Sequence, residues 1–311
     1  MNYRLSRFVL LRFARMLGTL WFLITLVFFA LHLAPGDAVD TLVSAGADAS
    51  VIAALRAELG LDRPLWLQYA SYLGDLLRLD FGVSWRSGTS VSAQLASAFG
   101  HTILLACAAL LVATVLGVGG GVLAAFYRNG TFDVGARLFA LIGISAPIFV
   151  INLLGIYLFA YKYPIFPTSG ARSWDSIVLP AVTLGLFVAA MMLRLVRAAT
   201  LEALAQDYVR AARSRGIPSR AIIWRHVVPN TLVTVVTMLG AQFGLLLGGS
   251  VITETVFAWP GLGQMTIHAI KIQDIPIVQG SVIAFAGSFM LINFVVDVLY
   301  PALDPRVQAS H

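Results

Sequence analysis

Residues 101–126 read HTILLACAALLVATVLGVGGGVLAAF, a stretch without a single Asp, Glu, Lys or Arg. A helix that crosses a membrane needs about 20 mostly apolar residues in succession, and this stretch is long enough. The whole chain of 311 residues has the same character, since 59% of its residues are hydrophobic and only 12% are charged. A soluble domain carries about 25% charged residues, so we predict that this chain lies in a membrane.

Apolar runs of the same kind occur on both sides of this stretch. They cover residues 16–34, 138–161, 177–197, 232–253 and 277–300. The first run follows several arginines, as in a secretory signal peptide, but it is longer than the apolar region of such peptides and no Ala-x-Ala cleavage site follows it. We therefore expect this run to be retained, and we predict an all-α polytopic membrane protein with six transmembrane helices.

Glycines spaced by four residues mark two of the predicted helices. They are Gly117 and Gly121 in the second helix, and Gly240, Gly244 and Gly248 in the fifth. Glycine at this spacing allows two helix backbones to approach closely. The pattern therefore predicts helix–helix contacts, with ordinary intramembrane glycine as the alternative for the first pair.

The distribution of basic residues predicts the orientation. With the N-terminus in the cytoplasm, the cytoplasmic segments hold 14 of the 21 Lys and Arg residues, and such segments are typically the more basic ones. We expect a multi-pass protein of the bacterial inner membrane with both termini in the cytoplasm. The expected parts are 1–34 (N-terminal tail and first helix), 35–100 (periplasmic loop) and 101–311 (core transmembrane domain, with a cytoplasmic coupling loop at 198–230). The net charge of +6 is then explained by the basic residues that set the orientation, and it is no sign of nucleic-acid binding. We therefore expect no nucleic-acid partner.

The outer segment contains two stretches with helical periodicity. Apolar residues recur at helical spacing around 51–59 and, after Pro64, around 66–76. We expect two short amphipathic helices near the membrane surface. They either cap the helix bundle or provide a docking surface for an external partner, and the sequence leaves both possibilities open.

The cytoplasmic segment between the fourth and fifth runs is amphipathic. Apolar residues from Leu201 to Ala212 recur at the spacing of one helix face. Gly216 is predicted to end this helix, because Pro218 follows at the distance typical of a helix C-terminus. A second short helix is expected around 220–228 and should end before Pro229. Such a pair of helices either docks on a partner protein or lies on the membrane surface as a basic amphipathic element.

The spacing in this segment matches a known motif. Ala211, Ala212, Gly216 and Pro229 have the spacing of the EAA loop of ABC importer permeases, which reads Glu-Ala-Ala, three residues, Gly, nine residues, Ile-x-Leu-Pro. The Glu, Ile and Leu are replaced by Arg210, His226 and Val228, as in the peptide/nickel branch. Further segments similar to this branch are 35–38, 60–65, 80–84, 253–263, 296–300 and 303–306. Over nearly its whole length, the chain resembles a permease subunit of the dipeptide/oligopeptide/nickel family of ABC importers.

The resemblance implies the type I ABC importer permease (MetI-like) fold and, within the branch, the first of the two permeases. It implies half of a pathway for dipeptides or oligopeptides, with glutathione, nickel chelates or oligosaccharides as alternative substrates. The implied partners are a second homologous permease subunit, two ABC ATPase subunits, an extracytoplasmic substrate-binding protein and membrane lipid. Contact with the ATPase subunits is expected at Tyr208, Ala211, Ala212, Arg213, Gly216 and Pro229.

The chain has no sequence motif for ATP hydrolysis. A phosphate-binding loop reads Gly-x4-Gly-Lys-Ser/Thr, and neither of the two lysines, Lys162 and Lys271, follows a glycine. We expect no enzyme activity and no cofactor or metal in this chain, with ATP and Mg²⁺ bound by the partner ATPase subunits.

Two rival functions remain at this point. An ion-coupled secondary transporter or channel would need a relay of ionisable groups inside the membrane, and the sequence lacks one. The other rival is a membrane-anchored scaffold without a transport role. The candidate pathway residues are Asn152, Gln242 and Glu254, with hydrogen bonding between helices as the alternative for Asn152 and Gln242.

Overall fold

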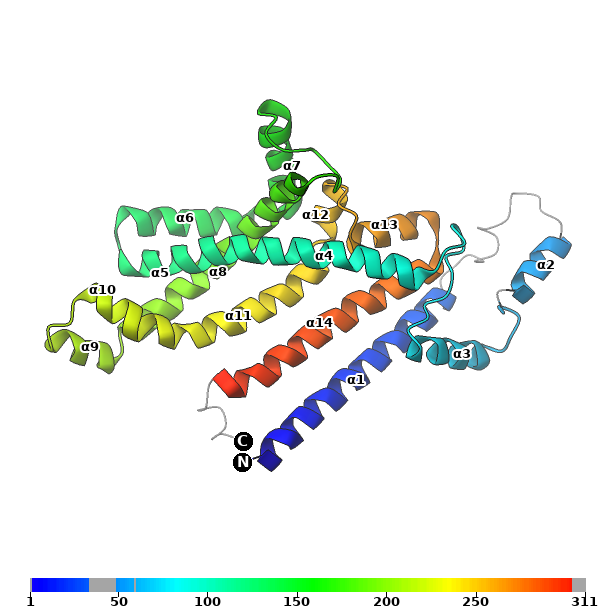
Figure 1. Cartoon of the computed structure of the whole chain (residues 1–311), viewed down its shortest axis with the longest axis horizontal. Helices are drawn as coiled ribbons and strands as arrows, with labels where there is room; N and C mark the ends of the chain where they lie inside the picture. Colours follow the sequence, from blue (N-terminus) through cyan, green and yellow to red (C-terminus); the bar gives the residue numbers. More distant parts are fainter. Residues whose placement is uncertain (1, 34–48, 59, 304–311) are drawn as a thin grey trace.

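The computed structural model describes residues 2–33, 49–58 and 60–303. Within these ranges the chain forms helices, and the only β contact is an isolated bridge between Val83 and Ser90 (Figure 1). The α-helices are α1 (Asn2–Leu33), α2 (Ala49–Glu58), α3 (Leu65–Leu77), α4 (Val91–Ala113), α5 (Gly119–Phe126), α6 (Thr131–Ser145), α7 (Ile148–Ile156), α8 (Val178–Leu204), α9 (Asp207–Ser214), α10 (Ser219–Ile222), α11 (Val228–Gly249), α12 (Val251–Val256), α13 (Leu262–Ile272) and α14 (Ile275–Leu303). Neighbouring helices are extended by the π-helical segments η1 (Thr114–Val118), η2 (Tyr157–Lys162) and η4 (Ile223–Val227) and by a 3-10 turn, η3 (Trp174–Ile177). The predicted all-α fold is confirmed.

Within the described residues, the predicted membrane-spanning runs are helical except for short breaks at 146–147 and 250. Four helical stretches of the described chain are long and apolar enough to cross a membrane, namely Arg7–Ala30, Val91–Phe126, Trp174–Leu204 and Ile275–Val298. A fifth is added if the bent pair Thr131–Ser145 and Ile148–Lys162 is counted as one span, and the remaining run forms α11, whose apolar part Val235–Gly248 is shorter. The second span begins at Val91, so it includes residues that were expected in the outer segment.

The third predicted run is not one straight helix. α6 and α7 meet at 104°, at a break around Pro147. Proline lacks a backbone N–H and disfavours the helical conformation in the residue before it. Ala146 accordingly has φ −77° and ψ 128°. The prediction of a single helix over 138–161 is therefore wrong, because it counted apolar residues and did not weigh the proline.

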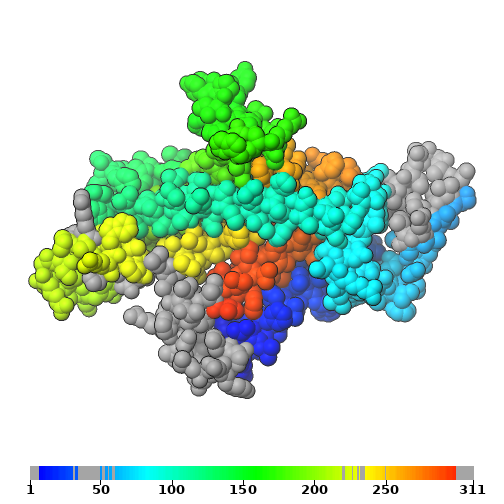
Figure 2. All heavy atoms as spheres, viewed as in Figure 1, coloured from blue at the N-terminus to red at the C-terminus, as the bar shows by residue number. Residues whose placement is uncertain are grey.

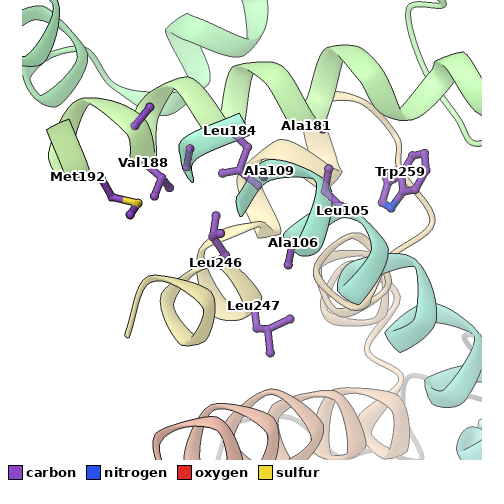
Figure 3. Packing of buried hydrophobic residues seen from close by; sticks show 12 residues of the cluster. Leu105, Ala106, Ala109, Ala181, Leu184, Val188, Met192, Leu246, Leu247 and Trp259 are labelled. Carbon is purple, nitrogen blue, oxygen red and sulfur yellow. The ribbon is translucent and has the colours of Figure 1, made fainter. Parts of the chain in front are cut away.

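The main core lies between α4, α8 and α11. Figure 3 shows side chains from these helices gathered in the space between them. Its buried members are Leu105, Ala106, Ala109, Ala113, Ala181, Leu184, Val188, Ala189, Met192, Leu246, Leu247 and Trp259. Five of these residues are alanine, so the helix backbones lie close together.

Glycines bring η1 and α5 close to α8. A Cβ atom at Gly117 would lie 2.8 Å from the Cβ of Met192. A Cβ atom at Gly121 would lie 2.9 Å from the carbonyl oxygen of Leu193. Both neighbours belong to α8, so a side chain at either glycine would push the helices apart.

The three glycines of α11 differ in what lies next to them. Gly240 lies against Val296 of α14, and a Cβ atom at Gly244 would lie 3.2 Å from the ring of Phe289. At Gly248 a Cβ atom would meet nothing within 4 Å in the part of the chain that the structure describes. Two of the three glycines therefore face α14 at close range, and the third faces open space.

Replacing Gly121 with alanine is expected to lower the free energy of unfolding by about 1–3 kcal/mol, because backbone atoms of α8 cannot move aside. Gly119 is the matched control, since a Cβ atom there would meet no described residue within 4 Å. Its replacement by alanine should leave stability unchanged or slightly raised, because alanine favours the helix. Thermal unfolding of the purified chain in detergent measures both variants, and equal effects would contradict the close contact assigned to Gly121.

The first and last helices lie side by side. The Arg12 Nη1 atom is 2.6 Å from the Asp297 Oδ2 atom, and the rings of Phe13 and Phe294 are 5.7 Å apart. The start of α1 and the end of α14 are therefore at the same end of the bundle, as an even number of membrane crossings requires.

Helix α3 packs against the C-terminal half of α1. The Tyr69 hydroxyl lies 2.6 Å from the Thr25 hydroxyl, and the Phe28 ring lies 5.5 Å from the ring of Tyr72. Burial raises the pKa of the Tyr72 phenol, so this group stays protonated. The two short helices expected here are present as α2 and α3, and Figure 2 shows them (blue to cyan) at the opposite end of the molecule from α9 (yellow-green).

Candidate functional site

The chain turns twice between α8 and α11. α8 ends at Leu204, and α9 begins only at Asp207. Between them Gln206 is extended, with φ −69° and ψ 154°. The predicted continuous helix from Leu201 to Ala212 is therefore wrong, because the chain changes direction at this turn. We call residues 207–227, which comprise α9, α10 and η4, the elbow.

Gly216 ends α9 in a left-handed conformation. Its φ is +76°, which favours glycine. The Gly216 N–H donates to the carbonyl oxygen of Arg213 at 2.9 Å, and the Ile217 N–H donates to that of Ala212 at 3.3 Å. This pair of bonds is a Schellman motif. The predicted end of the helix at Gly216 is confirmed.

The elbow has a small hydrophobic core of its own. Val209, Ala212, Ile222 and Val227 are buried against one another. Ala203 and Leu204 at the end of α8 pack against them, as does Ile217. The elbow therefore buries one apolar face within the chain, and this packing ties the end of α8 to the start of α11.

The opposite face of α9 is exposed. Tyr208 is 38% exposed and Ala211 is also exposed, and residues three apart share one face of a helix. Arg210 pairs with Asp207 at 3.0 Å on the surface. Of the residues expected to contact the ATPase subunits, Tyr208, Ala211 and Arg213 are exposed, Ala212 is in the core of the elbow, and Gly216 and Pro229 shape the backbone.

Pro229 does not end the second helix of the elbow. α10 continues through η4 into α11, and Pro229 lies in the first turn of α11. Proline has no N–H to donate, and the chain accommodates it where the π-helical turn η4 passes into α11. The prediction that the helix ends before Pro229 is therefore wrong.

A buried ion pair fixes the part of α8 that precedes the elbow. Asp133, in the first turn of α6, is fully buried. Its carboxylate accepts hydrogen bonds from Arg197 Nε at 2.5 Å and Nη2 at 2.9 Å, and from the Asn129 N–H at 3.0 Å. This pair was not predicted from the sequence. Two features of the sequence could have identified it. One is an acidic residue in the first turn of an apolar helix, and the other is an arginine inside another apolar helix.

A second buried carboxylate joins α4, α12 and α13. Glu254 has no exposed surface. Its Oε1 atom accepts hydrogen bonds from the hydroxyls of Thr102 at 2.8 Å and Ser250 at 2.9 Å. Its Oε2 atom accepts bonds from the backbone N–H groups of Gly263 at 2.7 Å and Gln264 at 3.2 Å. These two N–H groups open α13, where a negative charge is favourable.

The other two candidate pathway residues lie at different helix contacts. Asn152 of α7 is buried and donates to the hydroxyl of Thr253 at 3.1 Å, beside Glu254. Gln242 of α11 donates to the sulfur of Met191 on α8 at 3.4 Å. The structure thus places Asn152 against α12, where its partner Thr253 precedes Glu254 in the sequence, and places Gln242 between α11 and α8.

The chain is similar to known transport proteins. Residues 117–309 match the family described as "Binding-protein-dependent transport system inner membrane component", and residues 5–106 match its N-terminal counterpart. The protein "Glutathione transport system permease protein GsiC" of Escherichia coli (strain K12) is 39% identical over 301 residues, which cover 97% of this chain and 98% of that protein. The protein of the same name from Shigella boydii serotype 4 (strain Sb227) is 38% identical with the same coverage.

Solved structures share the fold. A chain of the methionine ABC transporter MetNI in an inward facing conformation superposes with a TM-score of 0.52 at 22% identity, covering 68% of this chain and 96% of that chain. A second crystal form gives a TM-score of 0.54 at 19% identity. The predicted MetI-like fold is therefore confirmed. The chain belongs to the family of binding-protein-dependent transport system inner membrane components, and it is a multi-pass permease component of an ABC importer in the inner membrane.

Proposed function

We propose that this chain and a second homologous permease subunit form a pathway for small peptides. Two ABC ATPase subunits bind ATP and Mg²⁺ and drive the pathway, and an extracytoplasmic substrate-binding protein delivers the cargo. The segments similar to the dipeptide and oligopeptide importers support this assignment and the place of the first permease. The names of the relatives support it as well, because glutathione is a tripeptide.

The observation that carries the proposal is the packed elbow. Its core joins the end of α8 to the start of α11, so a protein that moves the elbow moves two long helices together. The exposed face with Tyr208 and Ala211 is the docking surface for an ATPase subunit. The small side chain of Ala211 permits close approach, and the tyrosine supplies contact area. A rigid-body shift of packed helices is one of the known ways in which a local binding event moves a whole domain.

The orientation follows from the charges. We infer that both termini and the elbow are cytoplasmic, because 14 of 21 basic residues then lie on the cytoplasmic side. The parts of the chain are then the tail and first helix (1–34), the periplasmic segment (35–100) and the core domain (101–311) with its coupling loop (198–230). The contact between Arg12 and Asp297 supports a common side for the two ends.

The polar residues have different proposed roles. Gln242 and Asn152 are proposed to contribute polar groups along the pathway, at the α8–α11 and α7–α12 contacts. For Glu254 the contacts favour a positioning role, because both carboxylate oxygens are occupied by groups of the same chain. It holds α13 against α4 and thereby shapes the outer end of the bundle.

Replacing Gly216 tests the proposal. Valine is expected to disrupt the elbow, because a β-branched residue in the left-handed conformation costs about 1–2 kcal/mol, about tenfold in the population of the intact turn. Asparagine tolerates this conformation and is the matched control. Wild type and G216N should copurify with ATPase subunits that carry a phosphate-binding loop, and should show peptide-stimulated ATP hydrolysis in proteoliposomes.

The G216V variant should insert into the membrane but lose most of this stimulation. Full peptide uptake and full stimulation in G216V would contradict the role of the elbow. Copurification of wild type without any ATPase subunit would contradict the proposed function itself.

A further inference from the structure

A cavity of about 300 Å³ lies where the elbow meets the ends of α5 and α8. Its walls are formed mainly by apolar side chains, among them Phe126, Leu201, Leu204 and Ile223. The charged side chains that line it are Arg128 and Arg213. The described lining of the cavity therefore combines apolar residues with two arginines and includes no acidic residue.

The two arginines have no anionic partner within the described chain. Neither guanidinium makes a hydrogen bond or an ion pair with any residue that the structure describes, and both residues are exposed. Arg213 follows Val209 by four residues, so it shares the inward side of α9 and not the face of Tyr208 and Ala211. Two unpaired guanidinium groups at one opening are suited to a phosphate group, which they can bind in a fork geometry.

The cavity lies at the ends of two apolar spans. One apolar span ends at Phe126 and another at Leu204, and both of these residues line the cavity. Tyr127 and Trp224, next to lining residues in the sequence, are 51% and 67% exposed. Exposed tyrosine and tryptophan at the ends of spans are typical of the membrane–water interface.

We propose that this cavity binds an anionic phospholipid, with the phosphate between Arg128 and Arg213 and an acyl chain along Leu201 and Leu204. Basic pockets between membrane helices are known to bind such headgroups. The apolar walls favour a membrane lipid over a free phosphate. The concave shape at the end of two spans favours it over an ATPase subunit, for which the opposite face of α9 is available. The inference requires only that the chain crosses a membrane, so it does not depend on the proposed cargo or orientation.

Lipid binding to the purified full-length chain in detergent tests the proposal. Phosphatidylglycerol should raise the melting temperature and remain bound in native mass spectrometry, whereas phosphatidylcholine and inorganic phosphate should have little effect. The R128Q variant should bind phosphatidylglycerol about tenfold more weakly, because one charged hydrogen-bond donor group is lost. The R215Q variant is the matched control, because Arg215 is an exposed arginine of the same elbow that does not line the cavity.

A second variant tests the apolar part of the cavity. Ala205 is exposed at the edge of the cavity, and A205F should block lipid entry while both charges remain. Equal binding of phosphatidylglycerol and phosphatidylcholine, or equal weakening by R128Q and R215Q, would contradict the proposal. Tight binding of inorganic phosphate alone would assign the site to a soluble anion, and displacement of the lipid by added ATPase subunits would assign it to the partner protein.

Discussion

Replacing Glu254 with alanine is expected to lower the free energy of unfolding by about 4 kcal/mol or more. The carboxylate accepts four hydrogen bonds, and its removal leaves the N–H groups of Gly263 and Gln264 without this acceptor and the Thr102 hydroxyl without its acceptor. Each buried donor left unsatisfied costs about 1–3 kcal/mol. Gly261 and Gly263 carry no side chain that could replace the carboxylate, although a Cβ atom at either position would lie within 2.9 Å of Glu254. Thermal unfolding in detergent measures the loss.

The neighbouring Thr255 provides the control. It is exposed, and its hydroxyl bonds only to the carbonyl oxygen of Val251 in its own helix, so T255A should change stability by less than about 0.5 kcal/mol. The E254Q variant keeps the shape but presents an NH₂ group to two of the donors, and it should be intermediate. If E254A were as stable as T255A, the positioning role would be wrong. If E254Q kept its stability but lost peptide uptake, Glu254 would belong to the substrate pathway.

Replacing Asp133 with alanine should cost about 3 kcal/mol. Breaking a buried ion pair typically costs about 3–5 kcal/mol, because the remaining charge stays buried without a partner. The lower end applies here, since the Arg197 side chain keeps 19% of its surface exposed. Chemical or thermal unfolding measures this loss, and the melting curve of the purified chain is sufficient to detect it.

Two variants make the test specific. Arg137 lies 3.8 Å from the same carboxylate but is 53% exposed, so R137Q should cost less than about 1 kcal/mol. Replacing both partners with apolar residues, as in D133L/R197M, should recover much of the lost stability, because no unpaired charge remains. A double variant that is less stable than D133A would show that the pair itself, and not the orphaned arginine, dominates.

Much of the fold follows from local features of the sequence. Apolar runs of sufficient length locate the helices, because the bilayer demands an apolar exterior as well as an apolar core. The end of α9 was predictable because a glycine in a left-handed turn and a proline soon after it are local signals. The errors at Pro147 and Pro229 have a common cause. A proline permits more than one backbone outcome, and its neighbours in space decide between a sharp bend and a continuous helix.

The polar clusters could not be predicted in the same way. Thr102 and Glu254 are 152 positions apart, and Asp133 and Arg197 are 64 apart. No periodicity within a single helix relates such residues, so their contacts appear only when the helices are placed. Glu254 was identified as a polar residue near the end of a span, but its partners and hence its role were not. The residues of the elbow were easier to find, because their spacing is contained in one short segment.

The π-helical turn η1 between α4 and α5 contains one residue more than an α-helical turn. An α-helix advances about 100° per residue, so residues four apart drift by about 40° at each step. Ala113, Gly117 and Gly121 are spaced by four, and all three are nonetheless buried. The wider turn at Thr114–Val118 takes up this drift, and such a turn corresponds to one inserted residue. In an alignment of relatives, a one-residue gap in this turn should therefore coincide with loss of the glycine pair, because α5 would then be rotated and turn a different face toward α8.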